Sequence, residues 1–374
     1  MKKHLTGVEL HFVIEEISCL IGAKVAAVFQ PYQDDFLLQL FKGEKYLLRI
    51  KLPGYLYLTE FKQQNPSKPF AFCMALRKYL ESTILEEIKQ QGVERTVTFR
   101  FRGKEGMIFL IVELFSKGNL ILCREDMSII RLWTQLSVSS RELRAGQLYA
   151  YPEQRTSPFG ISKEDFMDKV KGSSKDTAVT MLAIDFGLGG VYAEEVCSRS
   201  GIEKNHAPRM IDDEQLQGLF VSLEQVLSQK SLGILVKEEG GKIIDIVPFD
   251  LKTYAEQELQ LYSTYNEALD AGVSELLLAD AEEKSHSGYD TKVARLTRII
   301  AEQEEHIKEL EEKATEDQRK GELIYEHYEE LNKLLADIQK IEKDHSWQEI
   351  KKKVEGHKNI KAVDPKMKVF VLEL

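Results

Sequence analysis

The chain has 374 residues, of which 30% are charged, and its formal net charge is −10. This length is enough for two or three domains with a buried core. Residues 1–150 hold 21 Lys and Arg against 16 Asp and Glu, a balance of +5, whereas the remainder holds 30 against 45, a balance of −15. An acidic protein is a poor candidate for nucleic-acid binding, but the basic first part keeps that function open.

The cysteines and the N-terminus exclude several classes of protein. Cys19, Cys73, Cys123 and Cys197 are far apart, with no Cys-x-x-Cys pair and no cluster of histidines. This spacing predicts reduced thiols and no metal site, cofactor or redox motif. The N-terminus lacks an apolar signal core, and no stretch approaches 18 consecutive apolar residues. The sequence therefore predicts a cytoplasmic protein without a membrane-spanning segment.

The first predicted element is a helix that begins with a capping box. Thr6 fits the N-cap and Glu9 follows three residues later, so capping alone would account for Glu9. The apolar residues of this helix recur on one face, at Leu10, Val13, Ile14, Ile17 and Ile21. Turn signals then separate four predicted strands, at about 24–30, 36–42, 45–51 and 55–61.

A second helix is predicted over residues 69–81. Pro69 would lie near its first position, where the missing N–H costs nothing. The residues predicted to face the core are Phe70, Cys73, Met74 and Leu80. Arg77 and Lys78 are left toward the rim, where charged side chains are usually solvated.

The stretch around residues 92–123 predicts a small antiparallel sheet. Apolar and polar residues alternate over 93–101, an apolar run covers 107–114, and a Lys-Gly-Asn turn precedes the next strand. This pattern predicts one buried and one solvated face. Glu94 and Arg95 are predicted at the mouth of the first strand, on opposite faces unless a bulge intervenes. On spacing alone they are ordinary surface charges.

The middle of the chain predicts a helical segment with a glycine turn. Residues 153–173 are polar and are predicted to be a linker. A helix through Leu182 should stop at the turn 185–190, and another should begin near Val191. Helix, glycine hairpin, helix is typical of a motif that binds nucleic-acid phosphates, although such a turn is more often a simple connection. The absence of a Walker lysine disfavours a nucleotide-binding loop.

The last part of the chain predicts a hairpin and then a long arm. Segments 232–237 and 242–247 flank two glycines and predict the hairpin, with a short helical stretch after it. From Leu296 to Ile338 apolar residues recur at spacings of four and three, as in a coiled coil. Gly321 falls in the weak middle of this seam, which allows either one helix or a bend. An unpaired seam predicts self-association.

Several of these stretches resemble one family. The runs "GVERTVTFRF…FLIVELFSKGNLILC", "PFAFCMALRKYL", "RAGQLYAYP", "LGGVYAEEVCSRSGI" and "RKGELIYEHYEEL" are similar to motifs of the NFACT family of ribosome-associated quality-control factors. In that family the pair after the glycine is Asp-Arg, so Arg95 matches and Glu94 departs from the pattern. The resemblance covers essentially the whole chain.

The resemblance implies an α+β fold with several parts. These are an N-terminal antiparallel sheet domain with two helices, similar to that of DNA glycosylases, at 1–160; a helix-hairpin-helix domain at 170–230; a hairpin and helical connector at 231–285; a coiled-coil arm at 286–345; and the start of a middle domain at 346–374. It also implies that the chain stops before the family's returning helix and C-terminal RNA-binding domain.

The resemblance also implies functional residues. The residues implied to bind tRNA are Glu9, Arg77, Lys78, Glu94 and Arg95, and those implied to contact the RNA backbone are Gly187, Leu188, Gly189 and Gly190. No catalytic residue, metal ligand or cofactor is implied, because the peptide-bond chemistry would belong to the ribosome.

The implied partners are the large ribosomal subunit, peptidyl-tRNA and aminoacyl-tRNA, and a ubiquitin ligase or another quality-control factor bound through the arm. Such factors recruit tRNA to stalled large subunits for untemplated C-terminal tailing of the nascent chain. Two alternatives stay open: a DNA-binding, glycosylase-like repair protein and a cytoplasmic coiled-coil scaffold. Those glycosylases use an N-terminal proline followed by an acid, whereas this chain begins Met1-Lys2-Lys3, which disfavours the repair function.

Overall fold

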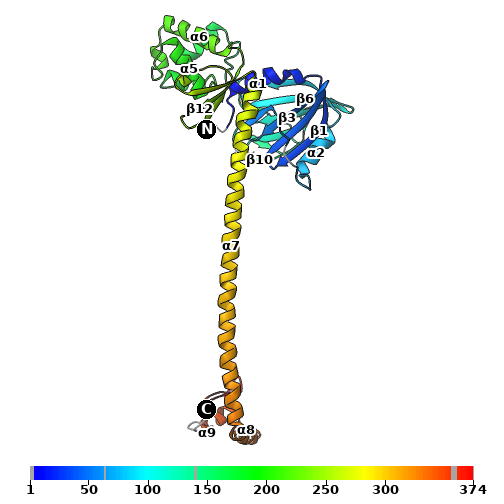
Figure 1. Cartoon of the computed structure of the whole chain (residues 1–374), viewed down its shortest axis with the longest axis vertical. Coiled ribbons are helices and arrows are strands. Elements are labelled where there is room, and N and C mark those ends of the chain that lie inside the picture. The colour runs from blue at the N-terminus through cyan, green and yellow to red at the C-terminus, as the bar shows by residue number, and fades with distance from the viewer. Residues whose placement is uncertain (1–3, 63–64, 139–140, 355–359, 374) are drawn as a thin grey trace. The chain divides into compact units, whose positions relative to one another are not determined.

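The computed structural model describes residues 4–62, 65–138, 141–354 and 360–373 (Figure 1). The chain divides into two compact units, Met1–Asp280 and Ala281–Leu374. Helices and antiparallel strands are mixed, in agreement with the predicted α+β class. The five finer domain boundaries stay a prediction.

An antiparallel sheet dominates the first unit. In the described part of the chain it has nine strands in the order β4-β3-β2-β1-β5-β6-β7-β8-β9. The strands are β1 (Lys24–Tyr32), β2 (Asp35–Lys42), β3 (Glu44–Lys51), β4 (Tyr55–Leu58), β5 (Ile84–Gln90), β6 (Thr96–Gly103), β7 (Gly106–Glu113), β8 (Asn119–Arg124) and β9 (Ile129–Leu132). The predicted strands are confirmed, with β4 shorter than expected; β5 and β9 were not predicted.

Two helices pack on this sheet, and local signals predicted both. Helix α1 (Gly7–Ile17) has the predicted capping box, in which Thr6 and Glu9 exchange hydrogen bonds. Ile21 lies beyond the helix, after the 3-10 turn η1 (Ser18–Leu20), and is 38% exposed. The capping signal was therefore right, and the predicted apolar face was one residue too long.

Helix α2 (Ala71–Leu80) begins later than predicted. Phe70 is its N-cap, so Pro69 lies outside the helix and not at its first position. Cys73 and Leu80 are buried as predicted, but Phe70 and Met74 are exposed. Leu76 completes the buried face of α2 with Cys73 and Leu80.

The prediction of one solvated sheet face is wrong for β7 to β9. A second apolar cluster covers that face, formed by Ile111, Ile121, Cys123, Ile129, Leu143 and Tyr149. The short strands β10 (Leu136–Val138) and β11 (Arg141–Leu143) pair beside it. Buried Glu113 accepts a hydrogen bond from the Tyr149 hydroxyl at 2.7 Å. Glu113 therefore helps to fasten the segment that covers the sheet.

A helical part follows the sheet, with α3 (Lys163–Lys171), α4 (Ala178–Ile184), α5 (Gly190–Ser200), η2 (Pro208–Met210) and α6 (Asp213–Leu227). Helix α3 lies inside the predicted linker, which was wrong there. Phe166 of α3 packs its ring 5.0 Å from Phe186 and 5.4 Å from Phe220. The packing of this one aromatic side chain holds α3, which is otherwise polar, against the neighbouring helical part.

Three strands precede the long helix. The predicted hairpin is confirmed as β12 (Gly233–Lys237) and β13 (Ile243–Val247). After the turn η3 (Lys252–Tyr254), strand β14 (Glu258–Tyr262), which was not predicted, pairs with β12 on its other side.

Helix α7 (Tyr265–Glu326) joins the predicted short helix and the predicted arm into one element. Its first turn is capped by Glu16, from the end of α1. The Glu16 carboxylate accepts hydrogen bonds from the backbone N–H groups of Tyr265 and Asn266 at 2.8 and 2.9 Å, and from the Asn266 amide at 2.6 Å. Glu16 thus satisfies the first two N–H groups of α7, and the Thr264 hydroxyl satisfies that of Glu267 at 3.1 Å.

Replacing Glu16 with alanine is expected to lower the free energy of unfolding by about 2 kcal/mol, because charged hydrogen bonds at a helix start are lost. Hydrogen exchange should then speed up over the first turn of α7. Glu15→Ala is the matched control, since Glu15 is exposed and lies 3.5 Å from His11 in a surface pair. Equal effects of the two variants would show that the capping contacts add no stability.

The second unit contains the rest of α7, followed by α8 (Tyr328–Glu342), α9 (Trp347–Val354), β15 (Ile360–Asp364) and β16 (Val369–Leu372). The helix passes through Gly321 without a break and ends at Glu326, so the bend allowed at Gly321 is not present. Trp347 packs 5.3 Å from Phe370, which joins α9 to the hairpin.

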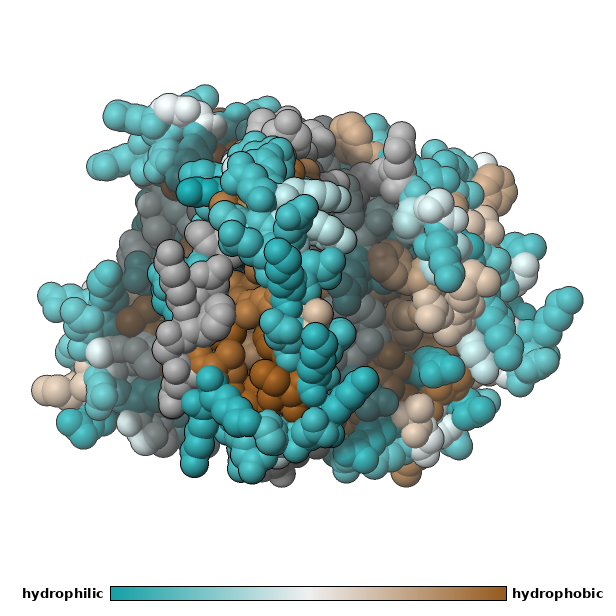
Figure 2. All heavy atoms as spheres, turned by 90° about the horizontal axis from the view of Figure 1, so that it is seen from below, coloured by the Kyte–Doolittle hydropathy of each residue, from teal (hydrophilic) through white to brown (hydrophobic). Residues whose placement is uncertain are grey.

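The part of the predicted seam that lies on α7 is exposed, whereas Leu331 and Ile338 of the same seam lie on α8 and are buried. Leu296, Ile300, Ile307 and Leu310 are each 52–55% exposed. Figure 2 shows the molecule from below the view of Figure 1, with brown apolar residues among teal hydrophilic ones. The coiled coil and the self-association therefore stay predictions.

Candidate nucleic-acid interface

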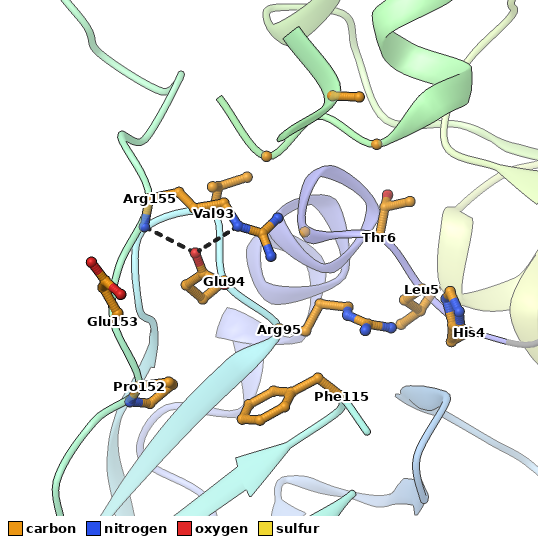
Figure 3. Close-up of a pocket in the computed structure, with 14 residues that line it drawn as sticks. His4, Leu5, Thr6, Val93, Glu94, Arg95, Phe115, Pro152, Glu153 and Arg155 are labelled. Carbon is orange, nitrogen blue, oxygen red and sulfur yellow. Dashed lines mark hydrogen bonds and ion pairs between the residues drawn. The ribbon is translucent and has the colours of Figure 1, made fainter. Parts of the chain in front are cut away.

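A cavity of about 480 Å³ lies in the first unit, where segments far apart in the sequence meet (Figure 3). Its lining comes from the residues that lead into α1, the turn before β6, the segment after the sheet, and the turn between α4 and α5. The lining residues are His4, Leu5, Thr6, Gly7, Val93, Glu94, Arg95, Phe115, Pro152, Glu153, Arg155, Ala183, Gly187 and Gly189. The cavity thus contains the predicted pair and two predicted glycines.

Glycines, which have no side chain, allow these segments to pack closely against one another. A Cβ on Gly7 would lie 1.8 Å from the carbonyl oxygen of Val93. A Cβ on Gly187 would lie 2.5 Å from Cγ1 of Val93, and one on Gly189 would lie 3.2 Å from Cγ2 of Thr6. Gly187 and Gly189 also have φ values of +67° and +77°, which favour glycine. The glycines therefore assemble the site by close packing.

The Glu94-Arg95 pair lies directly before β6, which begins at Thr96, so it is at the mouth of the strand as predicted but in a turn. The N–H of Glu94 donates to the carbonyl of Gln91 at 2.9 Å, which closes the turn. Alternation between faces does not apply in a turn, so both side chains line the same cavity. Spacing alone missed this arrangement.

Glu94 is engaged with Arg155. Its Oε1 accepts a hydrogen bond from the backbone N–H of Arg155 at 3.0 Å and lies 3.5 Å from the side-chain Nε of Arg155, as the dashed lines in Figure 3 show. Sequence reasoning missed Arg155, which lies in the polar segment predicted to be a linker. No local signal could have found it, because its partner is 61 residues away.

Arg95 extends into the cavity toward Leu5 in the view of Figure 3. Its side chain is partly buried and makes no hydrogen bond or ion pair with the residues that the structure describes. Burial lowers the pKa of the Arg95 guanidinium, the charge of Arg155 lowers it further, and Glu94 opposes both. The site therefore holds a cation whose positive charge is incompletely balanced.

Glu9 lies beneath this site and does not reach the surface. Its side chain caps α1 and accepts a hydrogen bond from the Tyr192 hydroxyl at 2.9 Å, and the residue is fully buried. Burial, followed by the charge of Glu9, raises the pKa of Tyr192 well above its usual value. Glu9 therefore joins α1 to α5. The resemblance implied that Glu9 contacts tRNA directly, but its side chain is buried and does not reach solvent here.

The predicted glycine turn lies between two helices, α4 and α5, and the helix-hairpin-helix motif stays a prediction. The N–H groups of Leu188 and Gly189 donate to carbonyls of Leu182 and Ala183 at 3.3 Å. Leu188 is also fully buried, so its predicted contact with the RNA backbone does not fit this arrangement. Helix α5 begins at Gly190 with no side-chain cap, which leaves its first N–H groups without intrahelical partners.

Arg77 and Lys78 are not brought to this cavity. The Arg77 Nε donates to the Val28 carbonyl at 2.8 Å, a contact that secures α2 to β1. Lys78 lines a separate cavity of about 520 Å³ with Arg131 of β9. The structure therefore separates the two basic residues of α2 from the other predicted site residues.

Among the residues with described positions, no group of three or more His, Cys, Asp or Glu side chains could hold a metal ion. None of the helices in the described ranges is both long and apolar enough to span a membrane.

Comparison with known proteins places the chain in a family. The model of the NFACT N-terminal and middle domains matches residues 6–369. Among similar curated proteins, the archaeal Rqc2 homolog aRqcH of Methanocaldococcus jannaschii is 29% identical, over 96% of this chain and 55% of that protein. The Rqc2 homolog RqcH of Bacillus subtilis is 28% identical, over 49% of this chain and 35% of its own length.

A mammalian relative and a solved structure complete the comparison. The ribosome quality control complex subunit NEMF of Mus musculus is 23% identical, over 87% of this chain and 33% of that protein. The crystal structure of the fibrinogen binding protein from Staphylococcus aureus has a TM-score of 0.59 at 23% identity, covering 71% of this chain and 97% of that one; it shows the fold alone. This chain spans about half the length of aRqcH. The chain belongs to the NFACT family.

Proposed function

We propose that this chain is the tRNA- and rRNA-binding part of a ribosome quality control factor. It would bind stalled large ribosomal subunits that carry peptidyl-tRNA and recruit aminoacyl-tRNA for untemplated C-terminal tailing of the nascent chain. Family membership supports this function, as do relatives named as a ribosome quality control complex subunit and as Rqc2 homologs. In this proposal the protein acts in the cytoplasm and is not an enzyme, because the ribosome forms the peptide bonds.

One observation carries the proposal to particular residues. Arg95 is partly buried in a cavity and has no acceptor among the residues that the structure covers. A guanidinium in this position is suited to a phosphate of the RNA backbone, which it can bind through two N–H groups at once. The start of α5, whose preceding residue Gly189 lines the same cavity, would supply further N–H donors.

The remaining predicted residues receive different roles. Glu9 would position α1 against α5, since it is buried. Arg77 and Lys78 would contribute to a second basic surface on α2, with Arg131 nearby. The exposed seam of α7 would bind a ubiquitin ligase, another quality-control factor or a second copy of the chain. Nothing in the site favours the glycosylase or the scaffold function.

Replacing Arg95 with alanine is expected to weaken binding of deacylated tRNA by about tenfold, and to reduce the slope of log affinity against log salt by about one, because one phosphate contact is lost. Filter binding at several salt concentrations measures both quantities. Arg144→Ala is the matched control, because Arg144 is 57% exposed, pairs with Glu142 at 2.7 Å and lies outside the cavity. Unchanged affinity of the Arg95 variant would refute the site.

The ribosomal part of the proposal has its own test. The chain should sediment with large subunits that carry peptidyl-tRNA and should be depleted from subunits without it. Recovery of DNA in place of ribosomal particles would instead support the repair function.

A further inference from the structure

Arg155 is the one arginine of the cavity that neither spacing nor family motif indicated. Its side chain is 52% exposed, whereas that of Glu94, which holds it, is only 12% exposed. The Glu94 carboxylate is thus largely buried against Arg155, whereas the side chain of Arg155 is half exposed to solvent. This arrangement suggests that the acid orients the arginine.

The segment around Arg155 has no helix or strand of its own, so side-chain contacts must fix it. A Cβ on Gly92 would lie 3.8 Å from Cβ of Ser157, so the segment runs beside the turn that carries Glu94. Further along, the Phe159 ring stacks on His11 of α1 at 3.7 Å. Before both of these places in the chain, the Glu94 carboxylate holds the backbone N–H of Arg155.

The remaining donors of Arg155 are available to a ligand. A guanidinium has five N–H groups, and Glu94 faces only the one at Nε. The Nη groups make no hydrogen bond or ion pair within the described ranges of the chain. Arg95 in the same cavity is also without an acceptor there, and the two arginine charges repel each other. An anion between them would relieve that repulsion.

The charges around the cavity include an opposing one. Glu153 also lines it and is exposed. Because Glu94 is paired with Arg155, Glu153 is the lining carboxylate whose charge would oppose an incoming anion. Removing the negative charge of Glu153 should strengthen the binding of an anion, and this gain in affinity can be measured.

We infer that Arg155 is a second phosphate-contacting residue of this site, and that Glu94 is a positioning residue that holds Arg155 and does not touch RNA. The inference rests on the proposed function, because it takes the RNA backbone as the occupant. It explains why the acid Glu94 lies next to Arg95, which binds a polyanion. Glu94 acts by holding Arg155 and not by contacting the RNA.

The test is tRNA filter binding by the full 374-residue chain, with deacylated tRNA as the probe. Arg155→Ala and Glu94→Ala should each weaken binding about fivefold and each reduce the salt slope by about one. The double variant should bind no more weakly than Arg155→Ala, because both changes remove the same contact. Glu94→Gln, which retains an acceptor for the Arg155 N–H, should lose less affinity than Glu94→Ala, and Glu153→Gln should gain affinity.

The possible failures can be told apart. If Arg95→Ala weakens binding but Arg155→Ala behaves like Arg144→Ala, only this inference fails. If neither arginine variant changes affinity, the proposed site fails as well. Stronger binding by Glu94→Ala, or additive losses in the double variant, would show that Glu94 faces RNA itself. A misfolded Glu94→Ala protein would leave Arg155→Ala as the decisive variant.

Discussion

Replacing Gly7 with alanine is expected to lower the melting temperature by about 5 °C or more, because it destabilises the first unit by about 3 kcal/mol. The added Cβ would lie 1.8 Å from the carbonyl oxygen and 2.9 Å from the carbonyl carbon of Val93. Both are backbone atoms, so no side chain can rotate away to make room. Either the start of α1 or the turn 92–95 must move, and the cavity between them must change shape.

Gly190→Ala is the matched control for this prediction. Gly190 is also the first residue of an 11-residue helix, but a Cβ there would have no atom within 4 Å. This variant should be neutral or stabilised by about 0.5 kcal/mol, since alanine favours the helix. Thermal unfolding followed by circular dichroism measures both variants. Equal melting temperatures would contradict the close packing.

Local sequence signals predicted elements that depend on neighbours in the chain. The capping box of α1 was found because Thr6 and Glu9 are three residues apart, and the hairpin of β12 and β13 because its glycines lie between two apolar runs. Strand β5 was missed for a physical reason: the pairing register shifts between Leu85 and Glu87, which interrupts the alternation that identifies a strand.

Helix α3 shows a second limit of sequence reasoning. Its composition is polar, and only Phe166 and Val170 are buried. Ser162 caps it, with its hydroxyl accepting from the N–H of Asp165 at 3.1 Å, and this capping signal could have revealed the helix. Composition was given more weight than the cap, and the segment was predicted to be a linker.

The site was predictable only in part, because its contacts are long-range. The family motif pointed to Arg95 and to the glycine turn, and both line one cavity. It could not reveal that Glu94 binds Arg155, 61 residues away, or that Glu9 binds Tyr192, 183 residues away. These partners depend on how the turn 185–189 packs on α1, and steric fit at glycines decides that packing.

The largest loss of stability is expected from Asp35→Ala, at about 3–5 kcal/mol. Asp35 and Arg49 form a two-pronged pair between β2 and β3, with Nε to Oδ1 at 3.0 Å and Nη2 to Oδ2 at 2.6 Å. Their side chains are 0% and 1% exposed. Removing the carboxylate leaves the Arg49 charge in the core without its counter-ion, and restoring its solvation would require the sheet to open.

The adjacent residue, Asp34, offers a matched comparison, because it also forms an ion pair but is more exposed. Asp34 pairs with Lys51 at 2.7 Å, but this pair is 43% and 17% exposed. Asp34→Ala should therefore lower the free energy of unfolding by less than about 1 kcal/mol, because water solvates both charges. The double variant Asp35→Leu/Arg49→Met should recover part of the loss, since it removes both buried charges together. Denaturant titration compares all three, and similar midpoints for Asp34→Ala and Asp35→Ala would mean that burial does not govern the strength of this pair.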